Sequence, residues 1–165
     1  MDLRETINNE IKKAMQGKNE LLLLVLRGLN AAFHNKEIEK RTKLSKTEKD
    51  IAKLEKLSKL SDEEVIEVIS SEAKKRNDSI VEFKKGNRSD LVEKEEKELE
   101  ILKKYLPEQM SEEQISEEAK KAIKETGAVG PKDTGKVMAA LMPKVKGRAG
   151  GDVVSRIVAT LLKGE

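Results

Sequence analysis

The chain has 165 residues, which is enough for one domain or two small ones and for a substantial hydrophobic core. Lys, Arg, Asp and Glu make up 39% of the residues and aromatic residues only 2%, with just 10 glycines and 3 prolines. This composition favours long amphipathic helices over sheets, so we expect an all-α protein. The absence of cysteine excludes disulfides, thiolate metal sites and a cysteine nucleophile. With no signal-like N-terminus and no apolar run of about 18 residues, we expect a cytoplasmic protein that does not enter a membrane.

The net charge of +3 is too small to indicate nucleic-acid binding by itself, but it is unevenly distributed. Residues 1–60 carry 14 basic and 9 acidic side chains, residues 61–125 carry 13 and 19, and residues 126–165 carry 7 and 3. We therefore expect an anionic partner to meet the two ends of the chain and not its middle.

Apolar residues at helical spacing predict the first helices. One helix is expected over residues 2–16 and a second over residues 19–41, whose wide apolar stripe indicates the central helix of a bundle. Residues 42–60 are helical in composition but only loosely periodic, and they carry six lysines against three acidic residues. This pattern is typical of a peripheral helix or a hairpin tip.

Capping signals predict the bounds of the next two helices. Ser61 and Glu64 form an S-x-x-E capping box that opens a helix ending at Gly86. Ser89 is expected to cap the following helix, and Pro107 ends it because proline cannot continue a helix.

We expect two domains, an N-terminal one over residues 1–107 and a C-terminal one over residues 108–165. The first is predicted to be a helical bundle or a long helical hairpin, and the second a small unit of three short helices. The three helices are expected from the Ser111 capping box to Gly127, over residues 132–142 before Pro143, and from an Asp152 cap onwards.

No constellation of residues predicts catalysis. His34, the single histidine, falls on a polar helix face and is expected to be an exposed bystander. Carboxylate pairs such as Glu117 and Glu118 have lysines three or four residues away, which is typical of solvated helix surface. Neither G-x-x-x-x-G-K-[ST] nor G-x-G-x-x-G occurs, which excludes the familiar nucleotide-binding loops. We therefore expect no catalytic residue, no metal site and no cofactor.

Basic residues gather in two runs near the end of the helix that starts after Ser61. The runs are "KKRNDS", residues 74–79, and "FKKGNR", residues 83–88. Cations in the last turns of a helix offset the negative end of its dipole, so we expect a structural role for both runs.

The stretch "LMPKVKGRAGGD", residues 141–152, admits two interpretations. Its proline, three glycines and Asp152 are typical of a connector that ends one helix, passes through positive φ and caps the next. Alternatively, Gly150 and Gly151 present backbone N–H groups at a helix N-terminus beside Arg148, an arrangement that binds phosphate. Asp152 would compete with a phosphate for these amides. The residues alone leave both interpretations open.

Longer segments resemble a known family. "EILKKYLPEQMSEEQI" (100–115) and "GKVMAALMPKVKGRAGGDVVSRIV" (135–158) closely resemble the YqeY family of small bacterial proteins. The likeness extends upstream through "VLRGLNAAFHNKEIEK" (25–40) and "KKRNDSIVEFKKGNRSDLVEKEEKELEIL" (74–102). The C-terminal part also resembles the tail domain of GatB, a subunit of the glutamine-dependent aspartyl/glutamyl-tRNA amidotransferase. This resemblance implies a tRNA-contacting module without the separate domain that forms the amide.

The resemblance also implies which residues contact nucleic acid. They are Lys136 in "GKVM" and Lys144, Lys146, Gly147 and Arg148 in "PKVKGRA".

The chain departs from the family pattern at two places. Gly150 and Gly151 stand where an Asp-Gly turn is expected, and residues 42–60 are longer than the usual link in the family. Relatives therefore imply nothing about that segment.

Three functions are consistent with these observations. The first is a non-catalytic accessory protein that contacts tRNA, or a complex of tRNA with an amidotransferase or a synthetase, through the basic loop. The second is a protein–protein interaction module that uses residues 1–105, and it predicts that Leu44, Ile51, Leu54 and Leu57 are not all buried. The third is a carbon–nitrogen ligase with glutamine as amide donor, which is disfavoured because the catalytic domain is missing and would have to come from a partner. No oligomeric state is predicted.

Overall fold

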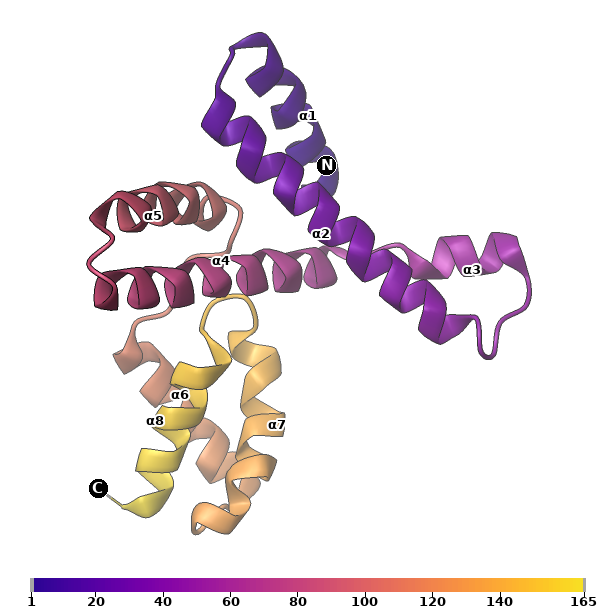
Figure 1. The fold of residues 1–165 in the computed structure, drawn as a ribbon. Helices are drawn as coiled ribbons and strands as arrows, with labels where there is room; N and C mark the ends of the chain where they lie inside the picture. The colour runs from indigo at the N-terminus through magenta and orange to yellow at the C-terminus, as the bar shows by residue number, and fades with distance from the viewer. Residues whose placement is uncertain (1, 165) are drawn as a thin grey trace. The chain divides into compact units, whose positions relative to one another are not determined.

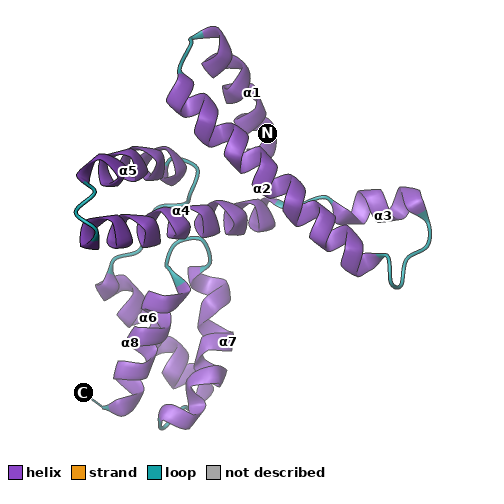
Figure 2. Cartoon of the chain, in the orientation of Figure 1, coloured by secondary structure: helices purple, strands orange, loops and turns teal. Residues whose placement is uncertain are grey.

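The computed structural model describes residues 2–164, and within them the protein has eight α-helices, one 3₁₀ helix and no strand (Figure 1, Figure 2). The prediction of an all-α protein is confirmed. Contacts between residues divide the chain into two compact units, Met1–Tyr105 and Leu106–Glu165, which we call the N-terminal and C-terminal units.

The helices follow one another with short connections. The N-terminal unit contains α1 (Leu3–Gln16), α2 (Glu20–Leu44), α3 (Ile51–Ser58), α4 (Asp62–Lys85) and α5 (Ser89–Lys103). The C-terminal unit contains α6 (Glu112–Thr126), the 3₁₀ helix η1 (Pro131–Asp133), α7 (Thr134–Val145) and α8 (Gly151–Lys163).

Helix α2 is the centre of the N-terminal unit and contacts each of its other four helices, in agreement with its wide apolar stripe. Helix α3 lies beside the C-terminal half of α2, and α4 and α5 form a tightly packed hairpin (Figure 1). The fully buried side chains that hold these helices together are Ile7, Leu26, Leu29, Phe33, Val65, Ile69 and Leu102.

Local capping signals predict some helix bounds correctly and others not. The Ser61–Glu64 capping box is confirmed, because the Ser61 hydroxyl accepts from the Glu64 amide at 3.3 Å and the Glu64 carboxylate accepts from the Ser61 amide at 2.8 Å. Ser89, in contrast, is the first residue of α5 and not its cap. The chain already turns into the helix at Arg88, whose carbonyl accepts from the amide of Val92 at 3.0 Å.

The segment over residues 42–60 is neither all helix nor all loop. Helix α2 continues to Leu44, three residues beyond the expected end, and α3 then occupies only eight residues. The Asp50 carboxylate caps α3 by accepting from the amide of Lys53 at 3.1 Å. This arrangement is a peripheral helix at the end of a hairpin, as the loose periodicity predicts.

Tyr105 lies at the end of the N-terminal unit, and its hydroxyl donates a hydrogen bond to the carboxylate of Glu10 on α1. Burial raises the pKa of the Tyr105 phenol well above its usual 10.0, and the hydrogen bond and negative charge of Glu10 raise it further. The unfolded chain therefore loses this proton at a lower pH than the folded chain does. The stability that Tyr105 contributes is present below about pH 10 and is lost as the pH rises above that value.

A pH titration of the phenolate absorbance checks this arrangement, since the chain has one tyrosine and no tryptophan. The native protein should titrate with a midpoint above 10.0, and the urea-unfolded chain at about 10. The Glu10→Gln variant should titrate between the two, because it removes the charge but keeps the burial. A native midpoint equal to that of the unfolded chain would contradict the contact between Tyr105 and Glu10.

The C-terminal unit is a three-helix bundle in which α6, α7 and α8 each contact the other two. The Ser111–Gln114 capping box that opens α6 is confirmed by two hydrogen bonds, of 3.0 and 3.3 Å. Gly127 ends α6 in the left-handed region, at φ +64°. The core consists of nine buried residues: Ile115, Ala119, Ala122, Val137, Leu141, Val145, Val154, Val158 and Leu162.

Two predicted bounds in this unit are wrong. Helix α7 begins at Thr134 after η1 and continues through Pro143 to Val145, although we expect Pro143 to end it after Met142. Proline removes one helical hydrogen bond, but Val145 is fully buried, and its packing keeps the last turn helical. Helix α8 has Gly150 as its N-cap, and Asp152 lies inside the first turn. An acidic residue there still interacts favourably with the helix dipole.

Candidate functional site

The candidate site is the turn between α7 and α8, which we call the α7–α8 turn, residues 146–150. Its backbone reverses at Gly147, which has φ +73°, while the Arg148 and Ala149 amides both donate to the Val145 carbonyl at 3.0 Å. Of the three glycines expected to allow positive φ, only Gly147 has it, because Gly150 is extended at φ −70° and Gly151 is helical. The connector interpretation therefore describes the backbone, with Gly147 as the residue that the turn requires.

The α7–α8 turn is held by the segment that precedes α6. The Met110 amide donates to the Arg148 carbonyl at 2.8 Å, and the Gln109 side-chain amide donates to the Gly147 and Pro107 carbonyls, both at 2.9 Å. The Arg148 guanidinium donates in return to the Glu108 carbonyl at 3.3 Å. The turn is thus fixed before any ligand arrives, which lowers the entropy cost of binding one.

Each of the three cations around the turn has a partner within the protein. The Lys144 ammonium pairs with the Glu125 carboxylate at 2.8 Å, Arg148 donates to Glu108, and Lys146 also has an interaction partner. The Lys144 side chain is still 40% exposed, so its pair with Glu125 is a surface ion pair that contributes little stability and exchanges easily.

A shallow hollow of about 400 Å³ lies beside these cations. It is lined by Met110, Gln114, Glu117, Glu118, Lys144 and Arg148. A hydrogen bond from Lys121 lowers the pKa of Glu118, and the positive charges of Lys121, Lys144 and Arg148 lower it further. The hollow therefore has carboxylates of α6 on one side and the cations Lys144 and Arg148 on the other.

The structure brings together four of the five predicted nucleic-acid-binding residues. Lys144, Lys146, Gly147 and Arg148 lie at the end of α7 and in the turn. Lys136 is exposed but lies in the first turn of the same helix, about 12 Å along the axis from Lys144. Lys136 is therefore a separate position and not a part of the α7–α8 turn.

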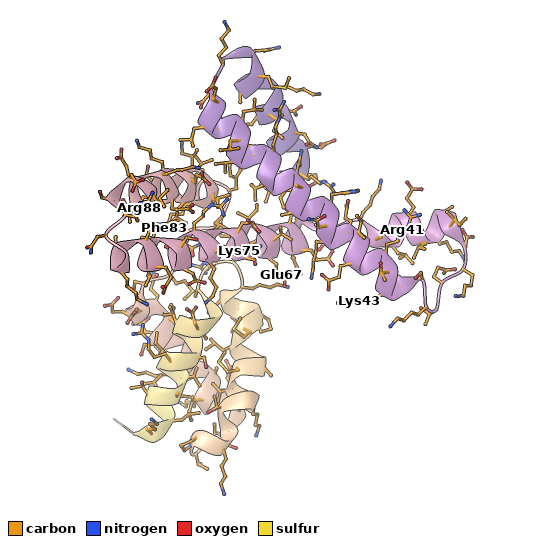
Figure 3. All side chains as sticks on the ribbon, viewed as in Figure 1. Arg41, Lys43, Glu67, Lys75, Phe83 and Arg88 are labelled. Carbon is orange, nitrogen blue, oxygen red and sulfur yellow. The ribbon has the colours of Figure 1, made fainter. Side chains whose placement is uncertain are left out.

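The basic runs on and after α4 have carboxylate neighbours, and only Lys84 and Lys85 lie in the last turn, where the predicted offset of the helix dipole applies. Lys75 pairs with Glu72 at 2.6 Å, Arg88 pairs with Asp90 at 2.9 Å, and both lie along or just after α4 (Figure 3). The chain supplies a carboxylate for each of these cations, so this face offers little free positive charge.

Other chemistry-bearing groups do not assemble. No group of three or more His, Asp or Glu side chains among residues 2–164 is arranged to hold a metal ion. His34 is exposed, as its polar helix face predicts. Between residues 2 and 164, every helix is too short or too polar to span a membrane.

The sequence interpretation missed that some exposed cations on α2 and α3 have no carboxylate partner among the described residues. Lys53 and Lys56 on α3 are exposed, and no carboxylate among the described residues is at salt-bridge distance from either. One signal was available, because Lys56 has no acidic residue three or four positions away on its helix.

Comparison with known proteins identifies the family. The family model described as Yqey-like protein matches residues 4–162. The chain belongs to the YqeY family. The resemblance drawn from the "YLP", "GKVM" and "PKVKGRA" segments is thereby confirmed.

Curated relatives of this YqeY-family chain carry the name altered inheritance of mitochondria protein 41, mitochondrial. The relative from Lachancea thermotolerans is 37% identical over 64% of this chain and 49% of its own length. The relative from Pyrenophora tritici-repentis is 33% identical over 85% of this chain and 69% of its own length. The relative from Kluyveromyces lactis is 36% identical over 60% of this chain and 45% of its own length. The chain thus spans about half the length of most of these relatives.

These names contradict the prediction of a cytoplasmic protein. The relatives are named as mitochondrial, whereas the prediction rested on the absence of a signal-like N-terminus and of a long apolar run. Neither feature separates the cytoplasm from the inside of an organelle, because folded helical bundles have the same composition in both.

Proposed function

We propose that this YqeY-family chain is a non-catalytic accessory protein that contacts tRNA, or a complex of tRNA with an amidotransferase or a synthetase, through the α7–α8 turn. The observation that carries the proposal is the grouping of Lys144, Lys146 and Arg148 around a turn that backbone hydrogen bonds hold in place. The resemblance to the tail domain of GatB supports tRNA as the partner.

The expected mode of contact follows from the composition. The chain has two phenylalanines and one tyrosine, so it has few side chains that can stack on unpaired bases. It would bind through phosphates and the shape of the RNA, with modest affinity that falls steeply with salt. On binding, a phosphate would replace Glu125 as the partner of Lys144, which costs little because that ion pair is exposed.

A tRNA titration at several salt concentrations tests the proposal. If each of the three cations neutralises one phosphate, the variant Lys144→Ala/Lys146→Ala/Arg148→Ala should lower the slope of log K against log salt by about 2 to 3. A matched control is Lys120→Ala/Lys124→Ala/Lys163→Ala, which removes three exposed cations from the same unit. An unchanged slope in the first variant, or an equal drop in both, would remove the α7–α8 turn from the binding site.

A protein–protein interaction module is the second candidate function. It is favoured by the exposure of Ile51 and Leu57, whose side chains are 70% and 50% exposed, while Leu54 is buried. A monomer that leaves large aliphatic side chains in water on one short helix is consistent with a partner that covers them.

A further inference from the structure

The hairpin of residues 40–59, which we call the basic arm, leaves much of its apolar surface exposed. It comprises the end of α2, the connecting loop and α3 (Figure 1). Among the described helices, α3 contacts α2 alone, and it buries only Leu54 and Ser58. Helices of this length are marginal without tertiary support, yet Ile51 and Leu57 on α3 remain largely in water. The arm thus has apolar surface that the rest of the unit does not cover.

The basic arm also carries positive charge that the protein does not neutralise. It contains eight basic and three acidic side chains. Lys40 pairs with Glu64 at 2.7 Å, and Lys43 pairs with Glu39 at 2.5 Å. The other six have no carboxylate at salt-bridge distance among residues 2–164: Arg41, Lys46, Lys49, Lys53, Lys56 and Lys59.

This excess charge distinguishes the arm from the other basic runs. Figure 3 shows Arg41 and Lys43 on the part of α2 next to α3, and Lys75 and Arg88 on and after α4. Lys75 and Arg88 have carboxylate partners, whereas Arg41 has none among the described residues.

We propose that the basic arm is a docking surface for an acidic amphipathic helix of a partner protein. Lys53 and Leu57 are one turn apart on α3, so a cation and an aliphatic side chain are neighbours on one face. A partner helix with aliphatic residues at helical spacing, flanked by Asp or Glu, would cover Leu57 beside Lys53 and supply the missing carboxylates. The inference rests on the second candidate function and is independent of the α7–α8 turn.

Charge and shape favour this occupant over three others. Nucleic acid would pair with the lysines, but its phosphates gain nothing from covering the exposed aliphatic side chains of Ile51 and Leu57. The loop of residues 45–50 has two lysines, two acidic residues and no large apolar side chain, so it offers an anionic bilayer neither net positive charge nor an apolar anchor. The arm of a second copy would bring like charges together.

Fluorescence anisotropy with designed peptides tests the proposal on the full chain. The probe is a helical peptide of about 18 residues with a leucine stripe flanked by glutamates, and its controls are a scrambled peptide and one with lysine in place of glutamate. The glutamate peptide should bind at least about tenfold more tightly than either control. The variants Lys53→Glu/Lys56→Glu and Ile51→Ser/Leu57→Ser should each weaken binding by about tenfold, through charge and through apolar contact respectively.

Two controls separate docking from other effects. The variant Lys12→Glu/Lys13→Glu makes the same charge change on α1 and should leave peptide binding unchanged. Hydrogen exchange over α3 shows whether each variant keeps this helix. The variant Lys53→Glu/Lys56→Glu should keep it, because both replaced side chains are exposed. Equal binding of all three peptides overturns the proposal. The proposal is also overturned if the glutamate peptide does not bind and the arm binds something else. That result would be binding of tRNA, of phosphatidylglycerol vesicles or of a second copy of the chain, weakened by Lys53→Glu/Lys56→Glu. Because the tRNA titration uses different residues, either proposal can fail while the other stands.

Discussion

Replacing Arg76 with methionine should lower the free energy of unfolding of the N-terminal unit by about 3 to 5 kcal/mol, the usual cost of leaving a buried charge without its partner. The Arg76 guanidinium on α4 lies 2.9 Å from the Glu98 carboxylate and 3.4 Å from that of Glu95, both on α5. The Glu98 side chain is only 7% exposed, and one Glu95 oxygen is buried without a hydrogen bond. Without Arg76, both carboxylates remain in the interface between the two helices.

Urea denaturation followed by circular dichroism measures the change in the free energy of unfolding. Two further variants show whether the lost ion pairs cause it. Arg41→Met removes an exposed arginine that has no carboxylate partner among residues 2–164, and should change stability by less than about 0.5 kcal/mol. The double variant Arg76→Met/Glu98→Gln should recover part of the loss, because it removes one of the buried charges. An Arg76→Met variant as stable as Arg41→Met would show that water reaches these carboxylates and that the network contributes little.

Leu141→Ala should destabilise the C-terminal unit by about 2 to 5 kcal/mol, which is most of the stability available to a domain of this size. Leu141 is fully buried in the α7 face that packs between α6 and α8. Residue 141 also lies one turn before Lys144, so loss of this packing should release the α7–α8 turn.

Hydrogen exchange read by mass spectrometry localises this effect. Peptides from α6, α7 and α8 should lose protection, while peptides from α1 to α5 keep theirs. Val129→Ala is the matched control, since Val129 is 94% exposed in the same unit and should change stability by less than about 0.5 kcal/mol. Equal loss of protection in both units would show that the two units unfold together.

The helices whose ends depend on local contacts are those that the sequence predicts best. The Ser61–Glu64 and Ser111–Gln114 boxes and the stop at Gly127 each involve residues within four positions, so their spacing alone indicates the structure. Pro143 shows the limit of this reasoning. Local chemistry argues for a helix end there, but the buried side chain of Val145 belongs to a core that only the folded unit creates.

In the candidate site, too, some features can be predicted from adjacent residues and others depend on the folded structure. The clustering of Lys144, Lys146 and Arg148 is a property of adjacent residues and is visible in the printed sequence. The partners of Lys144 and Arg148 are Glu125 and Glu108, which are 19 and 40 residues away. The partners of these two cations thus come from segments far away in the sequence, which composition does not reveal.

The all-α fold, the YqeY family and the caps that open α4 and α6 could be predicted from the sequence, because they depend on composition, motif and short-range spacing. Which charges are compensated by residues far away in the sequence could not be predicted, because it depends on packing. Packing brings carboxylates of α5 to Arg76 and those of α6 to Lys144, and it brings none to Lys53 or Lys56 on α3. Compensation between residues of different helices depends on the distances between these helices, and these distances are set by the buried apolar side chains that pack the helices together.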